Sequence, residues 1–317
     1  MTAPITDPPL ETGVSEVVGA AEALLTAHHE PPSSRFRLTL RRFARNRLAL
    51  LGLVGLALMF LLAYIGPHLN KWDYQTPDFL NSQSGPSAEH WFGTDDVGRD
   101  LYAQTMVGMQ KSLIIGLLVA LCSTGTAAVL GTCAAYFGGV TDRLIGWVID
   151  LFQVIPALLI LSIMSPFFQG KSWLIMIVLI AAFSWMVTAR VVRGMTLTMR
   201  EREFVRAARY MGVSPAAIIF RHIIPNIASI LIVDAALNVG FAISTESFLS
   251  FLNFGIRPPD VSLGTVLSAG TQSATTDQYY LFAIPAAFLV AIILFVNFIG
   301  DGLRDALDPN STGASAR

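Results

Sequence analysis

Three acidic residues fall inside or at the edge of long apolar segments of the chain, namely Asp150, Asp234 and Glu246. An ionised acid at the centre of a bilayer costs about 2.5–3.5 kcal/mol on insertion scales, so each group should face water or a partner. Together the three acids could form a proton relay. For Asp150 we expect instead a packing contact near the inner membrane surface.

Asp234 stands in helical register with other residues that can contact a solute. Asn238, Phe241 and Thr245 recur at the spacing of one helical face, and Glu246 lies at the outer end of the same apolar segment. We expect these residues to line a translocation pathway.

A further group of polar residues lies between two apolar segments, in residues 67–111. His90, Asp95 and Asp96 could be metal ligands, but nothing in their spacing selects a metal geometry. Asp100 is placed to cap a following helix, and Asp95 and Arg99 are placed to form an i,i+4 pair. We predict no bound metal.

A nucleotide site is not predicted either. Gly170, Lys171 and Ser172 look like the end of a P-loop, but Ser165 stands where the first glycine of that motif is required. No Ser-His-Asp arrangement stands out among the five histidines. We predict a non-enzymatic chain that holds no cofactor of its own.

The elements that must position these residues are membrane helices. Of the 317 residues, 53% are hydrophobic and 14% are charged, against roughly 25% charged residues in soluble domains. A bilayer core needs about 20 apolar residues as helix, and six segments qualify, so we predict an all-α protein with six transmembrane helices. The predicted ranges are 48–65, 112–135, 144–167, 173–189, 227–248 and 279–300.

The second segment carries small residues at every fourth position, including Ala127, Gly131 and Ala135. Such a face lets helices pack closely in lipid, so we expect a bundle.

The regions outside these segments differ in charge. Residues 1–34 contain no Lys or Arg and five acids, and they have no signal-peptide pattern, so we predict a disordered cytoplasmic tail. Residues 35–47 hold six arginines, with Phe36, Leu40 and Phe43 on one side, which favours an interfacial amphipathic helix. A basic arm for DNA is the alternative, and the apolar segment that follows argues against it. Residues 48–309 form the predicted transmembrane domain, and residues 310–317 form a second cytoplasmic tail.

Charge also predicts the orientation in the cell membrane. With the N-terminus inside, sixteen Lys and Arg residues lie on the cytoplasmic side and five outside. The positive-inside rule therefore predicts that both termini are cytoplasmic.

A polar helical hairpin interrupts the apolar segments at residues 203–226. Gly212 supplies the left-handed position that commonly ends a helix, and Ser214 and Pro215 can start a second one. That second helix runs toward Pro225, where the next apolar segment begins. The predicted hairpin is shaped to be held by something outside the bilayer.

The hairpin resembles the EAA loop of ABC-importer permeases, in which Glu-Ala-Ala is followed by Gly and then by a hydrophobic-Pro pair. Ala207, Ala208, Gly212 and Pro225 match, whereas Arg206 stands in place of Glu, and His222 in place of Ile. Further matching stretches are RRFARNRLALLGL, HWFGTDDVGRDL, ESFLSFLNFGIRPP and GDGLRDALDP. From about residue 36 to residue 309 the chain resembles the C-type permease subunits of oligopeptide, dipeptide and nickel ABC importers.

The resemblance implies a cytoplasmic coupling helix that docks in a groove of an ATPase subunit. It implies a second permease subunit as heterodimer partner, two ATPase subunits that hold ATP and Mg²⁺, and an extracytoplasmic binding protein. Arg206 and Arg209 could reach acidic groups on the ATPase, or lipid phosphate. The implied coupling residues are Glu203, Arg206, Ala207, Ala208, Arg209, Gly212, Ser214, Pro215, His222 and Pro225. The outer-loop residues expected to contact a partner are Trp91, Asp95, Asp96, Arg99 and Asp100.

The resemblance implies peptide as the cargo, with nickel or another small solute as alternatives. A secondary transporter using the three acids as a proton relay is the rival class. Internal repeats would favour that rival, and none is visible between the two halves of the sequence. A DNA-binding helix-turn-helix over residues 206–223 is a third interpretation, but the flanking apolar segments argue against it, and we expect no nucleic-acid partner.

Overall fold

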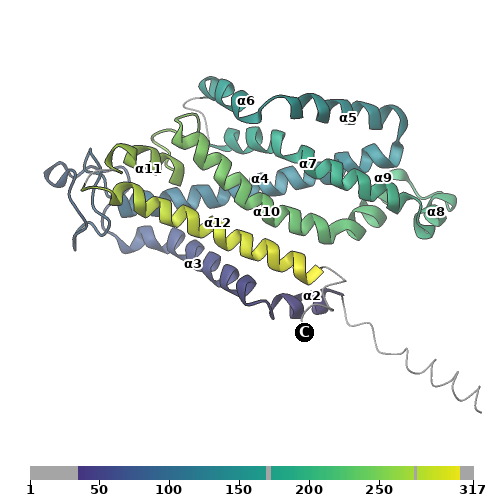
Figure 1. Ribbon diagram of the computed structural model, residues 1–317, viewed down its shortest axis with the longest axis horizontal. Coiled ribbons are helices and arrows are strands. Elements are labelled where there is room, and N and C mark those ends of the chain that lie inside the picture. The colour runs from purple at the N-terminus through teal and green to yellow at the C-terminus, as the bar shows by residue number, and fades with distance from the viewer. Residues whose placement is uncertain (1–34, 169–172, 275–276, 308–317) are drawn as a thin grey trace, which may run out of the picture.

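The computed structural model describes residues 35–168, 173–274 and 277–307 (Figure 1). The two predicted tails and the P-loop-like residues 170–172 lie outside these ranges. The regular structure of the described residues is helical, which confirms the all-α class. The helices are α2 (Arg35–Phe43), α3 (Arg47–Leu69), α4 (Leu101–Phe137), α5 (Gly139–Val154), α6 (Ala157–Met164), α7 (Leu174–Arg200), α8 (Glu203–Tyr210), α9 (Pro215–Ala217), α10 (Ile224–Phe251), α11 (Leu263–Gly270) and α12 (Tyr280–Leu307), with short η1 (Phe79–Asn81), η2 (Ser165–Phe168), η3 (Ile218–Ile223) and η4 (Thr271–Ser273).

Within the described residues, five continuous helices are long and apolar enough to cross a membrane. They are α3, α4, α7, the continuous helix Pro215–Phe251, and α12. A sixth crossing is possible if α5 and α6 act together, although the chain bends by 79° between them. The sequence-based segment 144–167 is therefore two helices rather than one. The bend falls at Ile155 and Pro156, because a proline lacks the backbone N–H and disfavours helical geometry in the residue before it.

The second spanning helix begins at Leu101, well before the predicted residue 112. Asp100 caps it by accepting a hydrogen bond from the Ala103 N–H at 2.8 Å, as the sequence predicted. The early turns of α4 contain polar side chains that find partners in other elements. Gln110 donates to the Ala63 carbonyl at 2.6 Å, and Lys111 pairs with Asp260.

The long helices lie side by side in an elongated bundle (Figure 1). Helix α4 packs against α7 and α10, while α12 packs against α3 and α10. One hydrophobic cluster joins Ile115 of α4, Ile180 of α7 and Leu249 of α10. The close contact of α4 with α7 depends on the small-residue face, since a Cβ added to Gly131 would lie 2.6 Å from the Ala189 carbonyl oxygen.

The two ends of the bundle differ in structure. Helix α8 and helix α2 lie at one end, and α11 lies at the other with the long loop between α3 and α4 (Figure 1). Helix α2 is shorter than the predicted interfacial helix, because the chain turns after Phe43 and Asn46 then caps α3. Phe43 packs on Ala49 and Ala306, whereas Leu40 is exposed.

Candidate functional site

The hairpin of residues 203–226 has the turn geometry that its sequence predicted. Gly212 has a φ of 76°, in the left-handed region that a side chain disfavours. The Ser214 hydroxyl accepts a hydrogen bond from the Ala217 N–H at 3.4 Å, with Pro215 in the first turn of α9. A tight turn therefore reverses the chain between α8 and α9.

The inner face of the hairpin is a small hydrophobic core. Val205 and Ala208 of α8 are buried against Ile218 and Ile223. Ala208 is only 2% exposed, so it belongs to the hairpin's own packing and cannot form a docking contact of the kind predicted for it. Ala207, one residue earlier, is exposed and remains available to a partner.

The outer face of the hairpin carries large apolar side chains that sequence reasoning overlooked. Tyr210 is 83% exposed, Met211 76% and Phe204 42%. In the sequence they flank the buried Val205 and Ala208: Phe204 precedes both, and Tyr210 and Met211 follow at the C-terminal end of α8. We call these three exposed residues the apolar tip, and Tyr210 also lines the pocket between α8 and the ends of α4 and α7.

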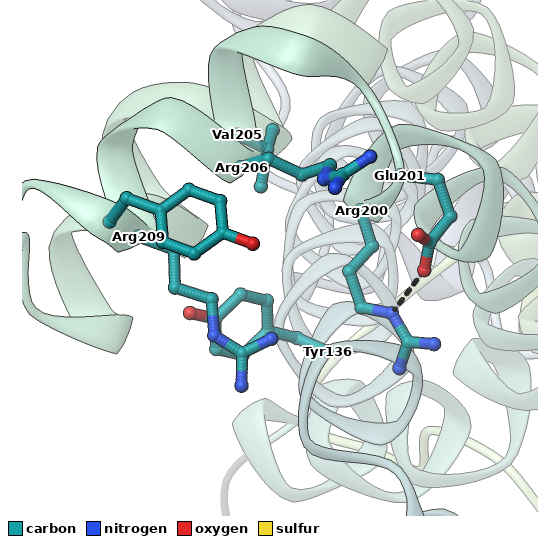
Figure 2. A pocket seen from close by; sticks show the side chains of 7 residues that line it. Tyr136, Arg200, Glu201, Val205, Arg206 and Arg209 are labelled. Atoms are coloured by element: carbon teal, nitrogen blue, oxygen red, sulfur yellow. Dashed lines mark hydrogen bonds and ion pairs between the residues drawn. The ribbon is translucent and has the colours of Figure 1, made fainter.

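A pocket lies between α8 and the adjoining ends of α4 and α7 (Figure 2). Its volume is about 410 Å³, and Arg206 and Arg209 line it with Tyr136. Arg200 at its rim pairs with Glu201 at 3.3 Å and donates to the Ala135 carbonyl oxygen at 2.9 Å. The arrangement suits an anionic group, since guanidinium and phenol donors surround it.

The sequence predicts a boundary at Pro225 between the hairpin and the next apolar segment. In the structure the hairpin continues into α10 at this position without a break. Residues Ile218–Ile223 form a π-helix that joins α9 to α10. A proline cannot donate its backbone N–H, so a carbonyl one turn earlier loses its partner. The Asn226 amide donates to the neighbouring His222 carbonyl at 2.6 Å. Half-buried His222 and exposed Pro225 thus lie within one continuous helix.

Asp234 lies at the meeting point of three helices. Its carboxylate accepts hydrogen bonds from Thr188 of α7 at 2.9 Å and from Thr124 of α4 at 3.0 Å. Asn238, one turn further along α10, donates to it at 2.8 Å. The structure therefore joins Asp234 and Asn238, as predicted. Phe241 is 56% exposed and Thr245 is half-buried, and lining of the pathway by this face stays a prediction.

Glu246 occupies a different environment and is completely buried. Its carboxylate accepts hydrogen bonds from Ser250 at 2.7 Å and from Ser112 of α4 at 3.1 Å. Ser112 also accepts a bond from the Leu263 N–H at the start of α11. Glu246 therefore joins α10 to α4 in this conformation, and α11 is attached through the same serine.

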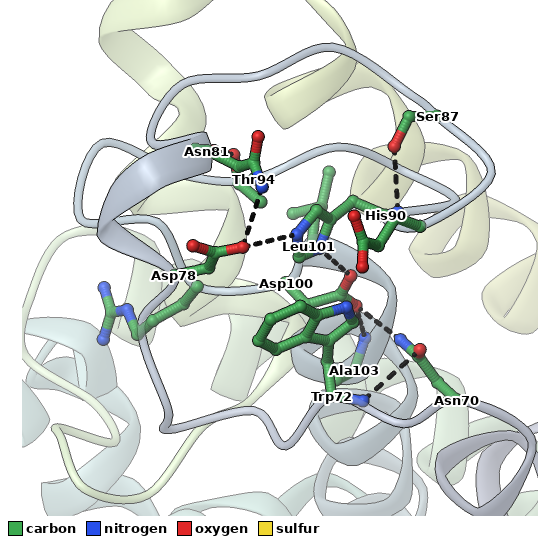
Figure 3. Close-up of polar contacts among 12 residues, drawn as sticks. Asn70, Trp72, Asp78, Asn81, Ser87, His90, Thr94, Asp100, Leu101 and Ala103 are labelled. Atoms are coloured by element: carbon green, nitrogen blue, oxygen red, sulfur yellow. Dashed lines mark hydrogen bonds and ion pairs between the residues drawn. The ribbon is translucent and has the colours of Figure 1, made fainter.

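The loop between α3 and α4 is organised by buried acids (Figure 3). Asp100 accepts hydrogen bonds from the Asn70 amide at 2.9 Å and faces the His90 Nδ1 at 2.8 Å. The other ring nitrogen of His90 lies 3.4 Å from Asp78. Hydrogen bonds from the Asn81 side chain, and further ones from the Leu80 N–H and His90, hold the pKa of Asp78 below its ordinary value, although desolvation opposes them.

Asp95 is the second organiser of this loop. It pairs with Arg99 at 2.9 Å, as predicted, and accepts a hydrogen bond from Gln104 at 3.0 Å. Asp95 and Asp100 are buried, so both stabilise the loop itself and neither is placed to contact a partner directly. Of the predicted contact residues, Asp96 and Trp91 are exposed and Arg99 is partly so.

The alternative of a metal site at His90 is not favoured by this geometry. His90 lies between Asp100 and Asp78, while Asp95 binds Arg99 and Asp96 points to solvent. Among residues 35–168, 173–274 and 277–307, no three His, Cys, Asp or Glu side chains are placed to hold a metal ion.

A helical bundle with several candidate membrane spans and a hairpin at one end defines a polytopic membrane protein. Residues 127–312 match the family described as binding-protein-dependent transport system inner membrane component. Residues 34–86 match the N-terminal TM domain of oligopeptide transport permease C. The chain belongs to this binding-protein-dependent transport family, and it is a membrane component of an ABC transporter, as its motifs predicted.

Several curated relatives match most of the chain. The oligopeptide transport system permease protein OppC of Mycobacterium tuberculosis H37Rv is 51% identical over 280 residues, which cover 88% of this chain and 96% of the relative. OppC of Escherichia coli K12 is 39% identical, covering 85% and 89%. OppC of Bacillus subtilis 168 is 36% identical, covering 84% and 87%.

The fold is also similar to that of a solved transporter chain. A chain from inward-facing structures of the MetNI methionine ABC transporter superimposes with a TM-score of 0.50 and 19% identity. The match covers 63% of this chain and 95% of the other. At that identity the match supports the permease fold and says nothing of the cargo.

Proposed function

We propose that this chain is one of two permease subunits of an ATP-driven importer for peptides. The names of the relatives at 36–51% identity support peptide as the cargo. The single structural observation that carries the transport role is the hairpin, with its packed inner face and its exposed apolar tip. Such a tip fits a hydrophobic groove in a soluble subunit, since large exposed apolar patches mark protein interaction sites.

In this proposal the hairpin docks in a groove of an ATPase subunit that holds ATP and Mg²⁺. Phe204, Tyr210 and Met211 enter the groove, and Ala207 allows close approach of the two backbones. Arg206 and Arg209 are exposed beside this tip and supply positive charge to acidic groups of the ATPase. The chain itself catalyses no reaction, and its contribution is a change of conformation.

The remaining partners follow from the same assembly. The bundle forms half of the translocation pathway, and a second permease subunit forms the other half. An extracytoplasmic binding protein delivers the peptide to the end that carries α11, where Trp91 and Asp96 are exposed. The hairpin end and both termini are cytoplasmic, as the distribution of Lys and Arg predicts.

Reconstitution of the complete complex in proteoliposomes tests this proposal. The second permease, the two ATPases and the cognate binding protein are coexpressed with this chain, and uptake of a labelled tripeptide is measured with and without ATP. We expect uptake that requires both ATP and binding protein. Uptake driven by a proton gradient without ATP would contradict the proposal and favour a secondary transporter. ATP-dependent uptake of nickel in place of the peptide would contradict only the cargo.

A further inference from the structure

Two ion pairs connect α5 to α7 on one face of the bundle. Arg193 binds Asp142 through two parallel hydrogen bonds, at 2.5 Å from Nε and 2.7 Å from Nη2. Arg190 pairs with Asp150, two turns further along α5, through a single contact from Nη2 to Oδ1. The two ion pairs therefore lie one after the other along α5 and α7.

The Asp150–Arg190 pair is more exposed to solvent than the Asp142–Arg193 pair. The side chain of Asp150 is 70% exposed and that of Arg190 is 50% exposed, whereas the corresponding values for Asp142 and Arg193 are 23% and 40%. The sequence predicts a packing contact for Asp150 near the inner membrane surface. The structure shows an ion pair at the surface instead.

The two partners of this open pair differ in their distance from a helix end. Arg190 precedes the last residue of α7 by ten positions, and Asp150 precedes the last residue of α5 by four. At a rise of about 1.5 Å per residue, Arg190 is roughly 15 Å from the nearer end of its helix, and Asp150 is roughly 6 Å from the end of α5, where the chain bends toward α6. Lipid contact would be costly for both charges, so the surface must meet water or protein.

The surface beside the two ion pairs is concave. A groove of about 540 Å³ runs between α5 and α7, and its lining includes Arg143 and Trp147 of α5 and Ala134 of α4. Helix α5 packs loosely on this side, since Ile149 is the one buried residue among its sixteen. Gly146 lies in the groove between the two acids, and a Cβ added there would meet no atom within 4 Å.

The other acids of the apolar segments differ from Asp150 in their partners. Asp234 and Glu246 are held by hydroxyl and amide donors between packed helices. Asp150 instead combines a full counter-charge with exposure to open space. An exposed ion pair is weak, because water screens it and two side chains must be held in place, so a charged solute can replace either partner.

We propose that the groove between α5 and α7 is filled with water and lines the peptide pathway, and that the Asp150–Arg190 pair binds the charged termini of a passing peptide. The proposal rests on the proposed function and assigns residues to it. The carboxylate of Asp150 suits the ammonium group of the peptide. The guanidinium of Arg190 suits its terminal carboxylate, for which Arg offers a planar pair of donors.

Thiol labelling in the reconstituted complex tests whether the groove holds water. Cys122 and Cys133 are first replaced by alanine, and Gly146→Cys is introduced as the reporter because its side chain meets open space. Val54→Cys on α3, at the opposite edge of the bundle, is the matched control, since Val54 is 66% exposed and apolar. A charged, membrane-impermeant maleimide is the probe.

We expect Gly146→Cys to react at least about tenfold faster than Val54→Cys, because only a hydrated thiol ionises to the reactive thiolate. A saturating tripeptide, delivered by the binding protein, should slow this labelling. Asp150→Asn and Arg190→Gln should each remove that protection while leaving the reporter accessible. Equal, slow labelling at positions 146 and 54 would overturn the proposal, as would protection that survives both charge substitutions. Because peptide uptake is measured on the same vesicles, failure of the labelling alone leaves the proposed function standing, whereas failure of uptake by the assembled importer does not.

Discussion

The hydroxyl of Thr188 on α7 donates a hydrogen bond to the carboxylate of Asp234 on α10 at 2.9 Å. Thr124 of α4 donates to the same carboxylate, so one acid joins three helices of the bundle. Asp234→Asn leaves a single acceptor oxygen for several donors, and unsatisfied buried donors cost about 1–3 kcal/mol each. We expect a lower melting temperature for Asp234→Asn and for Thr188→Ala.

The control for this prediction is Phe241→Leu, one to two turns along the same helix at an exposed position, which should leave stability unchanged. Thermal unfolding of the detergent-purified complex is measured beside peptide uptake. Loss of uptake with an unchanged melting temperature would contradict the structural role and support the pathway role that the sequence predicted.

Neighbouring alanines of α8 should respond differently to the same substitution. Ala207 is exposed and Ala208 is buried against Ile218. We expect Ala207→Trp to leave the chain folded and to release the ATPase subunits or uncouple ATP hydrolysis from uptake. Ala208→Trp should instead disrupt the hairpin, since overpacking a core costs about 1–3 kcal/mol. Copurification of the ATPases and limited proteolysis of the hairpin separate the two outcomes. Fully coupled uptake in Ala207→Trp would refute docking through this face.

Substitutions of Gly212 should act through backbone strain and not through steric clashes. Its φ is 76°, yet a Cβ there would meet no atom within 4 Å. Gly212→Val therefore strains the turn by about 1–2 kcal/mol without a steric clash. Gly212→Asn, which tolerates the left-handed region better, should retain more ATPase-coupled uptake than the valine variant. If the valine variant transports as well as the asparagine variant, the turn geometry does not limit coupling.

The lowered pKa of Asp78 makes the outer loop sensitive to acid. A carboxyl group whose pKa is lower in the folded state stabilises the fold above its unfolded pKa and loses that effect as pH falls through the folded value. We expect the loop to lose stability as pH falls below the ordinary value of 3.8. Trp72 stacks on His90 with ring centroids 4.7 Å apart, so its fluorescence reports on the loop.

In the Asp78→Asn variant this acid-dependent change of fluorescence should become smaller. A Trp72→Phe variant identifies the part of the signal that arises at this site, since the chain holds five tryptophans. An identical acid transition with and without Asp78 would show that another group controls it.

Local features of this protein were predictable from its sequence, and features that depend on distant contacts were not. The Gly212 turn, the Ser214 cap and the Asp100 cap each rely on residues a few positions apart, and each has the predicted geometry. The early start of α4 was missed because Gln104 and Gln110 appear too polar for a buried helix. Their partners, Asp95 and the Ala63 carbonyl, come from elsewhere in the chain.

The candidate site shows the same division. Helical spacing placed Asp234 and Asn238 together, but no pattern in α10 alone could reveal the two threonines from α4 and α7. The burial of Ala208 depends on how α8 folds back on η3, which the spacing of the motif does not encode. Exposure of the Asp150–Arg190 pair depends on the loose packing of α5, a property of the whole bundle.

The continuous helix Pro215–Phe251 has a mechanical consequence. Its 37 residues extend roughly 55 Å at the α-helical rise, from the hairpin to the neighbourhood of Glu246 and α11. Asp234 holds it near its midpoint to two other helices. A stiff rod held at its middle behaves as a lever, so a tilt imposed on the hairpin displaces the far end in the opposite direction. Opening at one side of the membrane and closing at the other would then be a single motion of one helix.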